Sequence, residues 1–177
     1  MKLILLGAPG SGKGTQSKLI CKAYKLKHIS PGEILRREIK QDTKEGSIIK
    51  PYVDNGKMAP DAVVFRLIKK ALPKDNYLID GFPRNHEQLK NVKNIKVDKV
   101  IFLKINEKTI KKRLIKRRNL ENRADDSEEA IKTRIKIYKR EMPKVLKFYK
   151  NKLTIINANQ SIKKVYSEIK KIVTKVN

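Results

Sequence analysis

Hydrophobic and polar positions alternate along the chain in two kinds of segment: short apolar runs, and longer stretches with an apolar residue every three or four positions. The short runs predict strands and the longer stretches predict amphipathic helices. The apolar runs cover residues 2–6, 27–29, 77–80, 99–105 and 153–156. Because helical stretches separate these runs, the pattern predicts an α/β domain with a parallel sheet.

Two stretches in the second half of the chain carry apolar stripes. One consists of Ile131, Ile135, Tyr138, Met142, Val145 and Phe148, and the other of Ile162, Val165, Ile169 and Ile172. Spacings of three and four place each set on one face of a helix. Pro143 lies inside the first stripe, so we expect a kink or a break near Glu141, because proline lacks the N–H of the helical ladder.

The length of 177 residues is typical of one domain. No run approaches 18 consecutive apolar residues, so no membrane-spanning helix is predicted. Cys21 is the single cysteine, which argues against a disulfide framework and a four-cysteine zinc site. The sequence begins with an apolar run rather than a signal peptide. These features favour a cytoplasmic protein.

The formal net charge of +26 raises the hypothesis of nucleic-acid binding. The excess is mostly lysine spread along the chain, and with no Trp, four Phe and six Tyr there is little aromatic surface for base stacking. We interpret the charge as a solvated lysine-rich surface that binds nucleic acid only non-specifically and in a salt-sensitive way.

Residues 7–16, which read GAPGSGKGTQ, directly follow the first apolar run and match the G-x-x-x-x-G-K phosphate loop. In such a loop, backbone N–H groups and the start of a helix face phosphate oxygens, and the lysine reaches the terminal phosphates. The residues predicted to wrap a nucleotide triphosphate are Gly10, Ser11, Gly12, Lys13, Gly14 and Thr15. Gly14 stands where a Ser or Thr usually binds magnesium, so we expect magnesium to be held through water.

A second motif, LIDGFPR at residues 78–84, places Asp80 at the carboxyl end of a predicted strand and Arg84 four residues later. Ligands bind at this edge of a parallel sheet. The carboxylate suits magnesium or its bound water, and the planar guanidinium suits phosphate. Further arginines follow at Arg113, Arg117, Arg123 and Arg134. We expect them to meet anions, because an arginine cluster without nearby acidic partners is costly.

With these motifs in this order, the sequence resembles the adenylate kinase family of nucleoside monophosphate kinases over essentially the whole chain. The segments that carry the resemblance are GAPGSGKGTQ, SPGEILR at 30–36, GKMAPD at 56–61, DGFPRN at 80–85 with Gln88, and RADD at 123–126 with Arg134. The resemblance implies one domain with a P-loop three-layer α/β/α fold and a central five-stranded parallel sheet. It also implies a small helical monophosphate-binding insertion at 30–59 and a short lid at 117–126, without structural zinc.

The resemblance further implies a monomeric enzyme that transfers a phosphoryl group in the reaction ATP + AMP ⇌ 2 ADP with Mg²⁺. The implied catalytic residues are Lys13, Arg84, Arg123 and Arg134. Besides the phosphate loop, the implied ATP contacts are Arg113, Arg117 and the backbone of Gln160. The implied AMP contacts are Pro31, Arg36, Lys57, Met58, Ala59, Gly81, Phe82, Arg84, Gln88, Arg123 and Arg134. Asp80 would orient the water shell of the magnesium ion.

This chemistry needs no general base, because a nucleoside monophosphate is mostly dianionic at neutral pH. We therefore interpret His28 and His86 as surface or structural residues. The task of such an enzyme is to bring two polyanions together and to exclude water, for which cations and a lid suffice.

Three features depart from the adenylate kinase pattern. Pro31 and Asn85, where adenylate kinases commonly have Thr, favour a UMP/CMP kinase, whereas Gln88 favours AMP. We give Gln88 the greater weight because it would read the base, while Asn85 fits a helix cap. In the lid, Arg118 and Asn122 replace glycines. A nucleic-acid-binding protein with a kinase-like fold is the alternative of another class, although every expected arginine is present.

Overall fold

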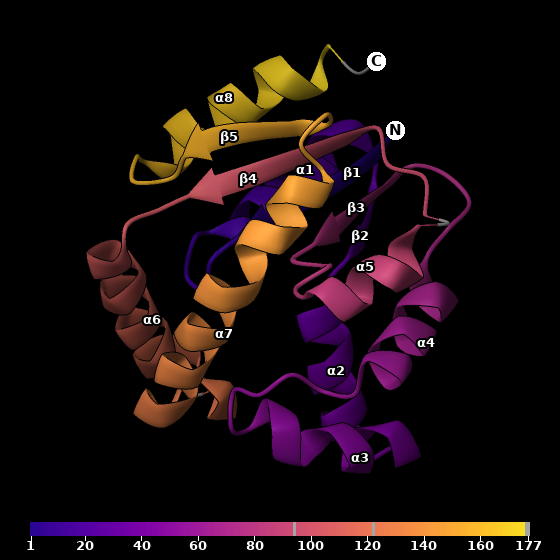
Figure 1. Ribbon diagram of the computed structural model, residues 1–177. Coiled ribbons are helices and arrows are strands. Elements are labelled where there is room, and N and C mark those ends of the chain that lie inside the picture. Colours follow the sequence, from indigo (N-terminus) through magenta and orange to yellow (C-terminus); the bar gives the residue numbers. More distant parts are fainter. Residues whose placement is uncertain (94, 122, 176–177) are drawn as a thin grey trace.

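A parallel sheet of five strands forms the centre of the computed structural model, which describes residues 1–93, 95–121 and 123–175 (Figure 1). The strands are β1 (Lys2–Gly7), β2 (Lys27–Ile29), β3 (Tyr77–Asp80), β4 (Lys99–Lys104) and β5 (Leu153–Asn157). Their order is β2-β3-β1-β4-β5, and all neighbouring pairs are parallel. The predicted α/β class is confirmed, and each predicted strand agrees with the structure to within one residue at either end.

Helices cover both faces of this sheet. They are α1 (Lys13–Tyr24), α2 (Pro31–Lys40), α3 (Lys44–Val53), α4 (Asp61–Ala71), α5 (His86–Val92), α6 (Glu107–Glu121), α7 (Glu128–Phe148) and α8 (Ile162–Val173), with a 3-10 turn at Ala124–Asp126. Helices α1 and α8 pack on one face, and α4, α5 and α7 pack on the other, which confirms the three-layer architecture. Among the described helices, none is long and apolar enough to cross a membrane.

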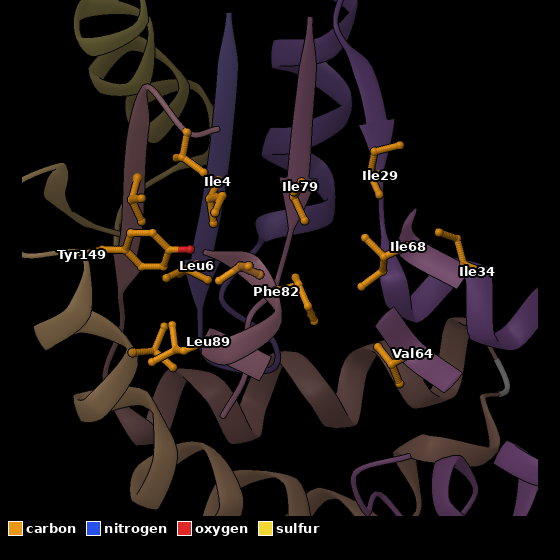
Figure 2. Packing of buried hydrophobic residues seen from close by; sticks show 14 of the residues in the cluster. Ile4, Leu6, Ile29, Ile34, Val64, Ile68, Ile79, Phe82, Leu89 and Tyr149 are labelled. Atoms are coloured by element: carbon orange, nitrogen blue, oxygen red, sulfur yellow. The ribbon is translucent and has the colours of Figure 1, made fainter. Parts of the chain in front are cut away.

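Alternate residues of β1 belong to two separate cores. Ile4 and Leu6 pack with α2, α4, α5 and α7, and Figure 2 shows both beside Ile79 of β3. Leu3 and Leu5 pack on the opposite face with α1 and α8. Because β1 is buried on both faces, its sequence reads as a continuous apolar run instead of an alternating one.

Helix α7 continues through Pro143 to Phe148, so the predicted break near Glu141 does not occur. Met142 and Val145, on either side of the proline, are both buried in the core. Packing of these two side chains keeps the helix continuous in spite of the hydrogen bond that proline removes.

The central position of β1 determines which loops meet. β1 pairs with β3 so that Leu5 lies opposite Asp80, and with β4 so that Gly7 lies opposite Leu103. The loops that follow β1 and β3 therefore leave the same edge of the sheet side by side. This edge is where parallel α/β sheets bind ligands.

The two segments that the sequence singles out as insertion and lid are structured. Residues 30–59 contain α2, α3 and the loop that leads to α4. Residues 117–126 begin in the last turns of α6, which contain Arg118, and end with the 3-10 turn. Asn122 lies outside the described residues.

Helices α2 and α3 lie in close contact at Gly46, and we predict that Gly46→Ala destabilises the fold. A side-chain carbon at Gly46 would lie 2.2 Å from the carbonyl oxygen of Glu38, which the backbone holds in place. We expect a loss of about 1–3 kcal/mol in the free energy of unfolding, measured by urea denaturation. Ser47→Ala, at the exposed next position, is the control. Equal stability of both variants and the wild type would contradict this account of the contact.

Candidate active site

The loop between β1 and α1 leaves the first turn of the helix open. Gly12 precedes α1 with φ of 91°, a left-handed conformation that glycine adopts without strain. Among the described residues, no side chain caps α1. The N–H groups of its first turn and the positive end of its dipole therefore face outward, as anion binding at a helix N-terminus requires.

Lys13 folds back over this loop. Its ammonium donates hydrogen bonds to the carbonyl oxygens of Gly7 and Ala8, each at 2.9 Å. Burial, together with the positive charges of Arg84 and Arg134, lowers the pKa of Lys13 to about 8, while Asp80 acts in the opposite direction. The lysine charge thus lies where an additional negative charge would stabilise it.

Asp80 ends β3 next to this lysine. A side-chain carbon built on Gly14 would lie 3.7 Å from Oδ2 of Asp80, and one built on Gly81 would lie 3.1 Å from Cε of Lys13. On its other side, Oδ2 of Asp80 lies 3.5 Å from Nε2 of His28. The buried carboxylate therefore faces both the phosphate loop and the neighbouring strand β2.

The surroundings of Asp80 fit a magnesium ion that is held mainly by other ligands. Within the described ranges, no group of three or more His, Cys, Asp or Glu side chains converges on one point. Magnesium prefers oxygen ligands and commonly takes one or two carboxylates together with water and phosphate oxygens. Asp80 supplies one such carboxylate.

Two arginines converge above Gly32, at the start of α2. A side-chain carbon built there would lie 3.2 Å from Nη1 of Arg36 and 3.5 Å from Nη2 of Arg84. Nε of Arg84 donates to the carbonyl oxygen of Gly81 at 2.9 Å, which fixes the base of the guanidinium. Although Arg84 is open to solvent, the protein atoms packed around it, together with the charge of Arg134, lower its pKa to about 10.

The arginines of the lid segment and α7 are paired with two buried aspartates. Nε and Nη2 of Arg123 each donate to Asp125 at 3.0 Å. Arg117 donates to both carboxylate oxygens of Asp126, at 2.7 and 2.5 Å. Arg134 donates to Asp126 at 2.8 Å and lies 3.0 Å from Asp125. The expectation that this arginine cluster lacks acidic partners is therefore wrong, because Asp125 and Asp126 pair with its members.

Asp125 also connects the lid segment to the insertion. Its carboxylate lies 3.9 Å from Nη1 of Arg36 in α2. Burial acts to raise the pKa of Asp125, but the hydrogen bond from Arg123 and the charges of Arg134, Arg123 and Arg36 hold it at about 2. Asp125 is thus ionised at neutral pH, and it occupies the centre of an arginine cluster.

Arg113 connects the phosphate loop to the loop after β5. Its guanidinium donates to the carbonyl oxygens of Ser11, at 3.4 Å, and Ala158, at 3.1 Å. Gln160 lies in the same loop, and its side chain turns away to Asn157 and Glu168. Arg113 and Gln160 therefore flank the phosphate loop on the side away from the insertion.

A pocket opens between the insertion, the loop after β3 and helix α7. All of the residues assigned to AMP except Arg123 line it: Pro31, Arg36, Lys57, Met58, Ala59, Gly81, Phe82, Arg84, Gln88 and Arg134, together with Lys13. Leu35, Val64, Tyr138 and Met142 add apolar surface that the sequence assignment missed. The helical stripe containing Tyr138 and Met142 marked these two residues as a buried face without showing that it borders a pocket.

The two residues that favoured a pyrimidine substrate have local structural roles. Asn85 caps α5, because its Oδ1 accepts a hydrogen bond from the Gln88 N–H at 2.7 Å. The predicted cap is confirmed. Pro31 is the first residue of α2, directly after the cap residue Ser30, and proline is favoured at that position.

The parallel sheet, the open helix N-terminus and the cluster of cations define a P-loop phosphotransferase. The comparisons identify its family. The adenylate kinase family model matches residues 5–154. The chain is 40% identical over 173 residues to an adenylate kinase of Encephalitozoon cuniculi, with 96% of each protein covered. It is 37% identical over 178 residues to one of Prochlorococcus marinus, covering 95% of this chain and 96% of the relative. The chain therefore belongs to the adenylate kinase family.

We predict that Asp125→Asn changes how stability depends on pH. Because folding depresses the pKa of Asp125 from 3.8 to about 2, its carboxylate stabilises the folded chain fully above about pH 4, and this contribution is lost as the pH falls toward 2. The variant should be less stable than the wild type at pH 6 by roughly 2 kcal/mol and should lose less stability between pH 4 and 2. Urea unfolding at several pH values measures both effects.

Glu128→Gln is the matched control, since Glu128 is an exposed carboxylate paired with Lys132. It should follow the wild-type curve closely. Parallel curves for Asp125→Asn and the wild type would show that Asp125 does not carry this linkage.

Proposed function

We propose that this protein catalyses ATP + AMP ⇌ 2 ADP with Mg²⁺. The observation that carries the proposal is the convergence of five cations on one pocket: Lys13, Arg36, Lys57, Arg84 and Arg134. Phosphoryl transfer between two nucleotides is catalysed by positioning and by charge stabilisation, and both require cations around the transferred group.

The monophosphate acts as the nucleophile without a protein base. A nucleoside monophosphate is mostly dianionic at neutral pH. Neither His28 nor His86 is among the described residues that line the pocket. The proposed chemistry therefore consists of an in-line attack by a phosphate oxygen of AMP on the γ-phosphorus of ATP. The bond from this phosphorus to the bridging oxygen breaks and ADP leaves, while the surrounding arginines and Lys13 hold the negative charge.

ATP would bind with its phosphates at the uncapped N-terminus of α1. Lys13 would bridge from the ATP phosphates toward the transferred phosphoryl group. Arg117 would exchange its contact with Asp126 for a contact with a phosphate. Arg113 would stack on the adenine of ATP, and the backbone carbonyl of Gln160 would meet the adenine edge. Two observations support this ATP site: the uncapped N-terminus of α1, and the hydrogen bonds that hold Arg113 between the phosphate loop and the loop after β5.

AMP would occupy the pocket beside the insertion. Arg36 and Arg84 would hold its phosphate, residues 57–59 would contribute backbone contacts, and Gln88 would bind the base. Arg123 and Arg134 would close over the transferred group. The apolar walls from Leu35, Val64 and Met142 support a binding site for a flat base.

A bound magnesium ion would supply positive charge to the nucleotide phosphates. Asp80 would hold its water shell. The carboxylate of Asp80 is buried beside Lys13 and the start of α1, so it faces the part of the site where the phosphates of ATP would lie.

We infer that residues 30–59 and 117–126 move together during the reaction. Gly56 of the first segment packs so closely on α7 that an added carbon would lie 2.4 Å from the carbonyl oxygen of Ala130. The ion pair between Arg36 and Asp125 joins the two segments. Closure of both would exclude water, which competes with AMP as acceptor.

We also propose that the protein acts as a monomer and that its basic surface meets nucleic acid only through non-specific charge.

Acceptor preference tests the function directly. With Mg-ATP at physiological salt, we expect rapid formation of ADP with AMP and little turnover with CMP, UMP or GMP. A coupled assay with each monophosphate offered separately measures this. Preference for CMP or UMP would assign the pyrimidine reaction instead, and no turnover by folded protein would overturn the proposal.

Two substitutions test the phosphate contacts. We expect Lys13→Ala and Arg84→Ala each to lower kcat/KM by roughly two orders of magnitude or more, because each removes a cation that stabilises the transition state. Arg37→Ala is the control for Arg84→Ala, since Arg37 is 61% exposed and is not among the residues that line the pocket. Circular dichroism checks that the variants fold. A near-normal rate for folded Arg84→Ala would contradict the role given to Arg84.

A further inference from the structure

Asp61 contacts the side chain of the proposed base-binding residue and lies outside the set of residues that line the pocket. It is the first residue of α4, directly after the insertion. Its Oδ1 accepts a hydrogen bond from Nε2 of Gln88 at 2.7 Å. Nδ2 of Asn85 also donates to this carboxylate, at 3.1 and 3.3 Å. Asp61 thus ties α4 to the first turn of α5.

These contacts fix which way the amide of Gln88 points. Oε1 of Gln88 accepts from the backbone N–H of Arg84 at 2.7 Å, and Nε2 donates to Asp61. If the amide rotated by half a turn, Nε2 would meet the Arg84 N–H, and Oε1 would meet the carboxylate. Both contacts would then be repulsive, so the carboxylate and the N–H group allow only one orientation.

The fixed amide retains a defined capacity for recognition. An amide side chain has two N–H donors and two acceptor lone pairs. Among the described residues, Asp61 takes one donor and Arg84 takes one lone pair. One N–H and one lone pair remain on a side chain that is only 1% exposed and that lines the pocket.

The orientation of this donor and acceptor determines which bases match. Adenine presents an acceptor at N1 and a donor at the 6-amino group. Hypoxanthine, which has the same size and shape, presents a donor at N1 and an acceptor at O6. A freely rotating amide would match either base by turning over, whereas a fixed amide matches only one of them.

We propose that Asp61 is a specificity-determining positioning residue, which makes the acceptor site select 6-amino over 6-oxo purine monophosphates by fixing the amide of Gln88. The inference rests on the proposed function, since it assumes that the base of AMP meets Gln88. A charged acceptor suits the role, because its hydrogen bonds are stronger than those of a neutral group.

Kinetics with AMP and inosine monophosphate (IMP) as alternative acceptors test the proposal. The measured quantity is the ratio of kcat/KM for AMP to kcat/KM for IMP. Asp61→Ala removes one of the two contacts that fix the amide and leaves only the one to the Arg84 N–H, so we expect this ratio to fall about tenfold or more, through a loss with AMP and a relative gain with IMP. A merely structural role would lower both values together and leave the ratio unchanged.

Two further variants complete the design. Glu45→Ala is the matched control, because Glu45 is a carboxylate of the insertion that contacts α4 through Arg66 at 3.0 Å but does not contact Gln88. It should keep the wild-type ratio. Asp61→Asn retains an acceptor without the charge, and we expect a smaller fall in the ratio, of about threefold or more.

The outcomes distinguish a failure of this inference from a failure of the proposed function on which it rests. If the wild type does not phosphorylate AMP, the proposed function itself fails. If the wild type prefers AMP and folded Asp61→Ala keeps the wild-type ratio, the role of Asp61 is wrong. Should Asp61→Ala not fold, an unchanged ratio in Asp61→Asn overturns the inference equally. In the background of Gln88→Ala, Asp61→Ala should have no further effect on the ratio, and an undiminished effect would also overturn it.

Discussion

Repulsion between like charges is the constraint on which the rest of this structure depends. The protein atoms packed around them and neighbouring positive charges lower the pKa values of Lys13, Arg84 and Arg134. Concentrating these cations therefore costs free energy that other parts of the fold must offset. Asp80 partly compensates Lys13, and Asp125 compensates the lid arginines. A site that already favours added negative charge is suited to bind two nucleotides and the charge that develops between them.

The sheet supplies the rigidity that this constraint requires. β1 lies in the middle of the sheet and is buried on both faces, so the phosphate loop begins from one of the most firmly held strands of the molecule. β3 is its hydrogen-bonded neighbour and carries Asp80 at the same edge. Two adjacent, hydrogen-bonded strands carry the phosphate loop and Asp80. Repulsion between the cations therefore cannot move the phosphate loop away from Asp80 without breaking the sheet.

Besides the apolar packing of α2 and α3 in the core, polar contacts join the insertion and the start of α4 to the rest of the site. Arg36 faces Asp125 of the lid segment, and Asp61, the first residue of α4, holds Gln88. Both contacts join segments that are distant in the sequence and that carry different parts of the proposed reaction. In the proposed reaction, phosphate binding, base selection and closure would therefore be connected through these side chains.

The amino-acid sequence by itself determined the strands, the phosphate loop and the DGFPR segment. Buried parallel strands demand continuous apolar runs, and a loop around phosphate demands glycine and lysine at set spacings, so both leave local signals. The tertiary structure alone decided that Asp126 pairs with Arg117, that Asp61 holds Gln88, and that α7 continues through Pro143. These outcomes depend on how helices pack against one another, since Asp61 and Gln88 lie 27 positions apart and meet only when α4 and α5 are in place. Local periodicity carries no information about such long-range partners.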